Sequence, residues 1–164
     1  MNVDVGLQDA VAVSATTTAD PGLAFEVFTA RIAQWWNPEH HVLPGTQKAM
    51  HIEPFVGGRL WDENTDGETC TWGRVLTWDP GRVFAFSWLI GTDWAVPAPD
   101  APGSRVTVTF TAVGGGTRVD LVHDHLAAHG PGWRGIREGV GGTGGWPAGL
   151  ALYVALADRA VPTP

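Results

Sequence analysis

Two histidines stand near the end of the segment VDLVHDH, at positions 123 and 125. Alternate side chains of a strand share a face, so His123 and His125 are predicted to continue the line of Val119 and Leu121. Because the two aliphatic side chains should face the core, the histidines could form a proton-transfer pair or chelate one ion beside a cavity. The alternatives are a strand end in solvent, or one core histidine bonded to the backbone.

Carboxylates occur in two further segments, HIEPF and RLWDEN. In the first, His51 and Glu53 share a face and would form an acid–base pair only if that face looked inward. In the second, the period of two places Asp62 on the face of Leu60, and the pattern alone does not say which face is buried. Desolvation would raise the pKa of a buried Asp62 unless a histidine or arginine partner lowered it.

The segment IAQWWNPEHH combines two adjacent tryptophans with two adjacent histidines. Neighbouring helical residues point about 100° apart, so only one of the two indoles can face the interior squarely. We expect the other, Trp36, to lie at the rim of a cavity. His40 and His41 would join it only if the loop after Pro38 folds back over the opening.

The chain contains nine tryptophans but only one tyrosine, Tyr153. Trp72 and Trp88 fall on neighbouring predicted strands, and Trp146 opens the last predicted helix. Large rings that line a cavity would suit a flat apolar ligand through stacking and burial of area. Plain core packing is the alternative for most of them.

The elements that position these residues are indicated by changes in hydrophobic period. Asp20 and Pro21 are typical of a helix start, and a helix or helix pair should follow as far as Asn37 and Pro38. A glycine-rich stretch over 127–145 is expected to be irregular or to contain one short helix, and the proline-rich segment 93–104 suggests a lid or an edge excursion. Strands are predicted over 10–19, 47–55, 59–64, 68–79, 82–90, 105–113 and 117–126, and a closing helix over 146–160.

Composition narrows the function classes. The 164 residues fit one domain, 1–164, and the net charge of -7 argues against nucleic acid and against anionic membranes. We see no signal peptide and no apolar run long enough to span a membrane. A single cysteine, Cys70, excludes an internal disulfide, so we expect a cytoplasmic protein. We expect this thiol to be buried and inert. Phosphate-loop, dinucleotide and Gly-x-Ser-x-Gly motifs are missing, and we expect no cofactor and no metal ion.

A family resemblance rests on an ordered set of segments that spans nearly the whole chain. They are AFEVFTARIAQWW, EPFVGGRL, the Asp66-Gly67 pair, WGRVLTWDPGRVFAFSW, VTVTF, GTRVDLVH and Gly145-Trp146. The set resembles the START-like (SRPBCC) superfamily, and within it the branch named for the C-terminal domain of the heat-shock-protein-90 ATPase activator. The resemblance implies an α+β helix-grip (Bet v 1-like) fold, with a curved antiparallel sheet wrapped around a long C-terminal helix and a hydrophobic cavity between them.

The resemblance implies no single activity, because the superfamily includes carriers, receptors and polyketide cyclases. Its pattern after the double glycine places Asp62 inward, where a pair with His123 or His125 is expected. We expect a protein that binds a small hydrophobic, aromatic ligand, with the oligomeric state, including a homodimer, left open. The candidate ligand-binding residues are Trp36, His40, His41, Asp62, Trp72, Trp88, His123, His125, Trp146 and Tyr153.

Two other functions remain as alternatives. One is a cavity enzyme of the cyclase, aromatase or hydrolase type, with Asp62, His123 and His125 as catalytic candidates, or with His40 and His41 transferring the proton. The other is a chaperone-associated protein.

Overall fold

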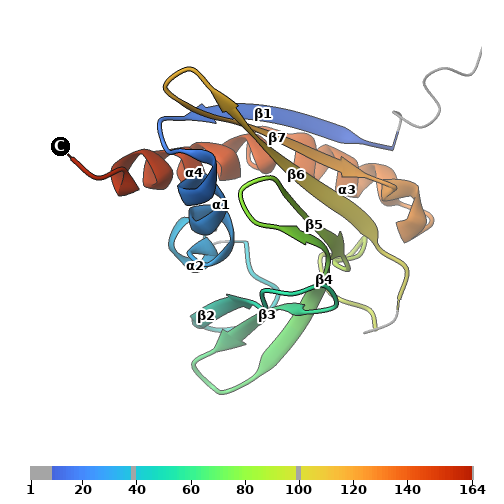
Figure 1. Ribbon diagram of the computed structural model, residues 1–164. Helices are drawn as coiled ribbons and strands as arrows, with labels where there is room; N and C mark the ends of the chain where they lie inside the picture. Colours follow the sequence, from blue (N-terminus) through green and yellow to red (C-terminus); the bar gives the residue numbers. More distant parts are fainter. Residues whose placement is uncertain (1–8, 38–39, 99–100, 164) are drawn as a thin grey trace, which may run out of the picture.

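The structure is a computed structural model that describes residues 9–37, 40–98 and 101–163 (Figure 1). Within these residues, strands and helices follow the predicted order of strand, helix pair, six strands and closing helix. The strands are β1 (Val11–Thr17), β2 (Gln47–Ile52), β3 (Arg59–Asn64), β4 (Thr69–Asp79), β5 (Val83–Trp88), β6 (Ser104–Val113) and β7 (Gly116–Asp124). The helices are α1 (Pro21–Thr29), α2 (Ile32–Trp35), α3 (Trp133–Gly141) and α4 (Trp146–Ala160), with a short 3-10 turn η1 (Leu126–His129) before α3.

The seven strands form one antiparallel sheet in the order β1-β7-β6-β5-β4-β3-β2. Figure 1 shows the sheet curling around the helical layer, with α4 running alongside β1. Helix α4 packs against β1, α1 and α2, so the inner face of the sheet and these helices enclose one apolar core. This is the α+β helix-grip arrangement that the sequence predicted.

Alternation along the central strands decides which side chains reach that core. In β6, Val106, Val108 and Phe110 alternate along the strand and are all buried. The register pairs Val106 with His123, Val108 with Leu121 and Phe110 with Val119. His123 therefore continues the inward line of β7 and is completely buried.

Local signals explain where the first helices begin and end. Asp20 is the N-cap of α1, and its carboxylate accepts a hydrogen bond of 2.8 Å from the backbone N–H of Leu23. The predicted helix region is a pair, α1 and α2, and Trp36 follows α2 in an extended conformation. The expected stop at Asn37 and Pro38 falls partly outside the described residues.

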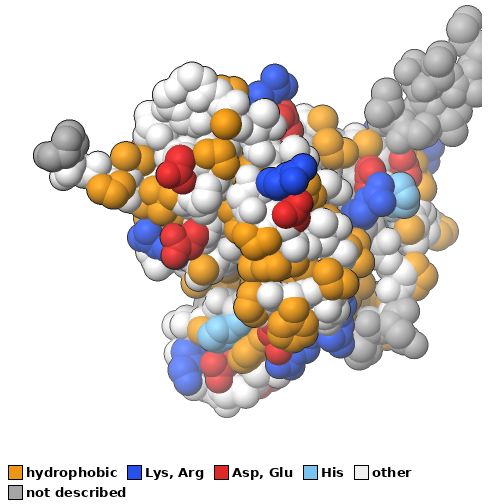
Figure 2. Space-filling view, in the orientation of Figure 1, with side chains coloured by type: hydrophobic (Ala, Val, Ile, Leu, Met, Phe, Trp, Pro, Cys, Tyr) orange, Lys and Arg blue, Asp and Glu red, His pale blue; other side chains and the backbone are white. Residues whose placement is uncertain are grey.

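Helix α3 is longer than the sequence indicated for its glycine-rich stretch. It spans nine residues because Ile136 and Val140, one helical turn apart, are both buried and hold the segment against the core. Within the described parts of the chain, no helix is long and apolar enough to cross a membrane. On the face in Figure 2, basic side chains lie beside acidic ones, with apolar side chains gathered over the middle of the sheet.

Candidate functional site

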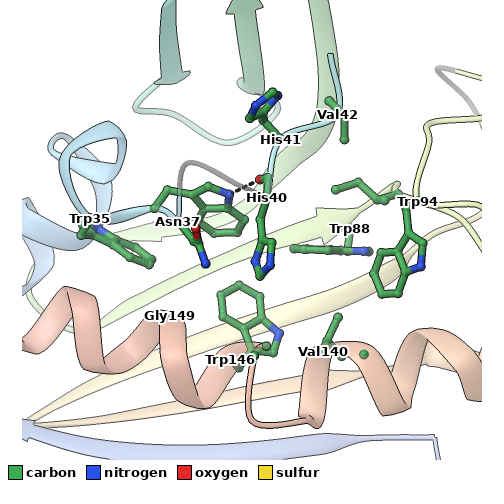
Figure 3. Close-up of a pocket in the computed structure, with 15 residues that line it drawn as sticks. Trp35, Asn37, His40, His41, Val42, Trp88, Trp94, Val140, Trp146 and Gly149 are labelled. Carbon is green, nitrogen blue, oxygen red and sulfur yellow. Dashed lines mark hydrogen bonds between the residues drawn. The ribbon is translucent and has the colours of Figure 1, made fainter. Parts of the chain in front are cut away.

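A pocket of about 480 Å³ opens where the end of α2, the end of β5, the end of α3 and the start of α4 meet (Figure 3). Five of the nine tryptophans line it. Its lining residues are Trp35, Trp36, Asn37, His40, His41, Val42, Trp88, Ile90, Trp94, Gly139, Val140, Gly144, Gly145, Trp146 and Gly149. Of the candidate ligand-binding residues, Trp36, His40, His41, Trp88 and Trp146 lie in this lining.

The adjacent indoles of Trp35 and Trp36 take different roles. Trp35 is buried, and its indole N–H donates to the backbone oxygen of Val27 at 3.1 Å. Trp36 is half-buried, and its indole N–H donates to the backbone oxygen of His40 at 2.6 Å. The helix therefore directs one ring into the core and one into the pocket wall, and the Trp36 bond draws the His40 backbone towards the pocket.

The wall is a cluster of tryptophan rings in mutual contact. The Trp36 ring lies 5.4 Å from Trp72, 6.3 Å from Trp88 and 5.7 Å from Trp146, measured between centroids. Trp88 and Trp146 are 5.6 Å apart. Trp72 supports the wall from behind and is not among the lining residues. Trp146 meets Trp36 and Trp88 edge-on, which is a favoured geometry for aromatic pairs, so the rings pack against one another without a ligand.

The two histidines after Trp36 point in opposite directions. Figure 3 shows the His40 imidazole reaching into the pocket towards Trp146 and beside Trp88, whereas the His41 ring turns away. The His40 backbone N–H donates to the backbone oxygen of Asn37 at 2.9 Å, which together with the Trp36 bond fixes the position of His40. His41 Nδ1 lies 2.8 Å from the backbone oxygen of Leu43. His40 is thus the imidazole best placed to meet a ligand.

A buried hydrogen-bond chain leads from the pocket wall to the surface. The Trp146 indole N–H donates to His123 Nδ1 at 3.0 Å, and His123 Nε2 lies 2.7 Å from Ser104 Oγ. Ser104 Oγ lies 2.8 Å from His129 Nε2, and His129 is half-buried. Because an indole can only donate, we assign the His123 proton to Nε2, so that Ser104 Oγ accepts it and in turn donates to His129.

This chain orients Trp146 and is not suited to acid–base catalysis. Burial, assisted by the nearby His129, lowers the pKa of His123 to about 3, so its imidazole is neutral near pH 7. Its Nδ1 is occupied by Trp146, and an indole N–H does not exchange its proton in enzymatic acid–base steps. His123 thus fixes the indole that forms one pocket wall and does not itself line the pocket.

The predicted shared face of His123 and His125 is wrong. Strand β7 ends at Asp124, and His125 takes a left-handed conformation with φ 59° as the chain turns into η1. Its side chain is 63% exposed and lies 3.3 Å from the Asp124 carboxylate. Alternation holds only while the strand continues, so the second histidine leaves the inward line.

Asp62 faces inward as predicted, but its partner is an indole. It is 1% exposed and accepts a hydrogen bond of 3.0 Å from Trp72 Nε1, with a second from the backbone of Val42. Burial raises the pKa of Asp62, although these hydrogen bonds and the nearby His41 oppose the rise. The expected pair with His123 or His125 is not formed, because β3 and β7 are separated by three strands at about 4.8 Å per spacing.

Substituting Asp62 separates its hydrogen bonding from its charge. Asp62→Ala should lower the free energy of unfolding by about 2–3 kcal/mol, because it leaves the buried Trp72 indole N–H and the Val42 N–H without an acceptor. Asp62→Asn keeps an acceptor oxygen and removes a charge that burial disfavours, so it should cost about 1 kcal/mol or less. Urea unfolding at pH 7 measures both, and equal losses would show that the carboxylate charge matters here.

Tyr153, a candidate ligand-binding residue, and the thiol of Cys70 both lie outside the pocket lining. Tyr153 is fully buried, and its hydroxyl donates to the backbone oxygen of Ala24 at 2.7 Å, which ties α4 to α1. Cys70 lies half-buried on β4, where burial raises the pKa of its thiol. No group of three or more His, Cys, Asp or Glu side chains in the described ranges could hold a metal ion.

Trp94 is the main lining residue that sequence reasoning missed. It is 49% exposed, has a left-handed φ of 61°, and lies in the segment predicted as a lid, of which residues 99 and 100 are not described. A Cβ atom added to Gly139 would lie 2.5 Å from Cη2 of Trp94, so the ring approaches α3 where a glycine leaves room. The sequence feature that could have identified Trp94 is a large apolar residue within a proline-rich loop.

Comparisons with known proteins agree with this fold. Residues 18–148 match the family model described as activator of Hsp90 ATPase homolog 1-like protein. The anthrahydroquino-γ-pyrone synthase Txn09, solved in complex with a ligand, is 37% identical, with 90% of this chain and 96% of that chain covered and a TM-score of 0.63. Comparison with curated proteins produced no match.

More distant solved structures share the fold. A protein from Nitrosomonas europaea is 14% identical with a TM-score of 0.68, over 93% of this chain and 96% of that chain. One from Mycobacterium smegmatis is 21% identical with a TM-score of 0.63, over 97% and 94%. Together with the matched family model, the helix-grip architecture shows that the chain belongs to the activator of Hsp90 ATPase homolog 1-like family of the SRPBCC superfamily.

Proposed function

We propose that this protein binds a flat polycyclic aromatic molecule in the tryptophan-lined pocket and catalyses a ring closure on it. The observation that carries the proposal is the His40 imidazole, which reaches into a pocket lined by five tryptophans. The pocket volume of about 480 Å³ is within the range usual for small-molecule sites. Indole faces and edges favour a planar conjugated ligand over a flexible aliphatic chain.

The relative Txn09 supports the choice of reaction. Its name describes the synthesis of a γ-pyrone on an anthrahydroquinone, and its identity of 37% extends over most of both chains. A γ-pyrone ring can close when a hydroxyl oxygen adds to a carbonyl carbon and the resulting hemiketal loses water. The C–O bond and a ring C=C form, while the carbonyl C=O and one C–H of the methylene between the two carbonyls break. The water that leaves carries the former carbonyl oxygen, the hydroxyl proton and that methylene proton, and no electrons are transferred to a second molecule.

His40 can serve both halves of such a reaction. A neutral imidazole can take the proton of the attacking hydroxyl, and the resulting imidazolium can return it to the departing oxygen. Asp62 and His123 are less suited, because each is already held by an indole N–H. The walls would contribute by holding the attacking oxygen and the carbonyl carbon near each other.

The proposal is tested by mixing the protein with an anthraquinone that carries a 1,3-diketone side chain next to a phenolic hydroxyl. Chromatography with mass detection should show a product lighter by one water, formed faster than in buffer alone. The same molecule should quench tryptophan fluorescence saturably. Absence of quenching would contradict the pocket assignment, whereas binding without acceleration would contradict the catalytic part.

A carrier or binding protein is the second candidate, and the histidine chain favours it. His123 and Ser104 are hydrogen-bonded in the chain that orients Trp146, so they are not free to transfer a proton, and few other side chains in the pocket could do so. Such a protein would bind the diketone and the closed pyrone with similar affinity and would not accelerate their interconversion.

The close approach of Trp94 to α3 makes a prediction about ligand release. Gly139→Ala should push the Trp94 ring away from the pocket mouth and speed dissociation of a bound anthraquinone by about fivefold, equivalent to about 1 kcal/mol. Gly135→Ala is the matched control, because it lies in the same helix and its added Cβ meets nothing within 4 Å. Stopped-flow fluorescence measures both rates, and equal rates would show that Trp94 does not retain the ligand.

A further inference from the structure

The indole N–H groups of the tryptophan cluster differ in whether they have a hydrogen-bond acceptor in the protein. Those of Trp35, Trp36 and Trp146 donate to Val27, His40 and His123, and the N–H of Trp72 behind the wall donates to Asp62. Among the described residues, Trp88 Nε1 is a buried side-chain atom without a hydrogen-bond partner. Four neighbours are satisfied by protein atoms, which makes the fifth a specific exception.

Trp88 belongs to the pocket lining, and its donor is buried at the pocket wall. It is the last residue of β5 and is 5% exposed, and its ring is packed against Trp36, Trp72, Trp146 and His123. These contacts on several sides leave the ring little freedom to turn. Figure 3 shows its nitrogen on the side that faces Trp94, across part of the pocket lining.

An unpartnered buried donor is unfavourable and favours any ligand that brings an acceptor to it. Neighbouring protein groups do not supply one, because His123 Nδ1 accepts from Trp146 and His123 Nε2 bonds Ser104. A pure hydrocarbon would fill the same space but would leave the N–H unsatisfied. A ring oxygen at the edge of a planar ligand could accept in the plane of the indole, which is where its N–H points.

We propose that the Trp88 indole N–H is the specificity determinant of the pocket and selects polycyclic aromatics that carry a ring carbonyl or hydroxyl oxygen. This inference rests on the proposed function and refines its substrate class to quinones and their reduced forms. Trp88 is a binding residue in this account and takes no proton. A site built to donate a hydrogen bond rejects the analogue that lacks the acceptor more strongly than a purely apolar wall does.

The test compares two soluble probes that differ at the acceptor, 9,10-anthraquinone-2-sulfonate and anthracene-2-sulfonate. Isothermal titration calorimetry should show that the wild-type protein binds the quinone about tenfold more tightly, which is the usual size of one hydrogen bond. In Trp88→Phe, which keeps an aromatic ring but has no N–H, the two affinities should become nearly equal. The readout is the ratio of the two affinities in the same variant. A general loss of packing would weaken both probes alike and would leave this ratio unchanged.

Trp36→Phe is the matched control. Its indole N–H already donates to His40, so removing it should weaken both probes and leave the quinone preference in place. A preference that survives in Trp88→Phe, or that disappears equally in Trp36→Phe, would overturn the inference while leaving the aromatic pocket intact. If neither probe binds the wild-type protein, both the inference and the proposed function fail.

A second measurement needs no stable variant. In protein labelled with ¹⁵N at the indoles, the quinone should shift the Trp88 N–H proton resonance downfield, as expected when a hydrogen bond forms, and anthracene-2-sulfonate should not. The resonance is assigned by its disappearance in Trp88→Phe, or by contacts to the Trp146 ring if that variant does not fold. The same shift with both probes would contradict the inference.

Discussion

His40→Ala is expected to lower the turnover number of ring closure by about 100-fold to 10,000-fold, the usual contribution of a positioned acid–base group. Binding of the diketone should change only a few-fold, because the indole walls remain and the His40 backbone can still accept from Trp36. Single-turnover kinetics and a fluorescence titration on the same variant separate the two effects.

His51→Ala is the matched control for that experiment. His51 is exposed and stacks on Trp61 at 4.2 Å, and it is not part of the pocket lining. Its removal should leave turnover unchanged. If His40→Ala closed the ring as fast as the wild-type protein, the catalytic role of His40 would be wrong, and the carrier function would become the better account.

His123→Leu is expected to lower the free energy of unfolding by about 2–3 kcal/mol at pH 7, because it orphans the buried Trp146 indole N–H. The loss should shrink in acid. The folded-state pKa of His123 is about 3, below the ordinary 6.5, so the unfolded chain binds a proton first as the pH falls. The wild-type protein should therefore lose about 1.4 kcal/mol per pH unit between roughly pH 6 and pH 4 through this group, and the variant should not.

Urea unfolding of both proteins at pH 7 and pH 4.5 measures this difference. Carboxylates, including the buried Asp62, are present in both proteins, so their contribution to the pH dependence of the free energy of unfolding cancels in the comparison. His125→Leu serves as the control, since its exposed side chain should leave the pH dependence unchanged. Parallel pH dependence of the wild-type protein and His123→Leu would mean that His123 is not held neutral in the fold.

The parts of the fold that sequence predicted are those fixed by local pattern. Alternation in VTVTF puts Val106, Val108 and Phe110 on one face, which is the buried one, and Asp20 with Pro21 marked the start of α1. The rim position of Trp36 was also accessible, because adjacent helical residues diverge, whereas the place of His40 depended on whether the following loop folds back. Each of these inferences needs only a few neighbouring residues.

The parts that sequence did not predict depend on distant strands and on chain ends. The Asp62–Trp72 pair requires the register of β3 with β4, and the chain of His123, Ser104 and His129 joins β7 to β6 and to η1. The outward turn of His125 depends on where β7 stops. The single domain, the homodimer, the cytoplasmic location and the chaperone link stay predictions.

The central claim is that a planar, oxygen-bearing ring system occupies the tryptophan-lined pocket. A crystal structure of the protein with 9,10-anthraquinone-2-sulfonate tests this most directly. The tricycle should lie among Trp36, Trp88 and Trp146, with one ring oxygen within about 3.2 Å of Trp88 Nε1. A probe found instead in the shallow groove between β1 and α4, beside Val13, Ala15 and Leu150, would contradict the account.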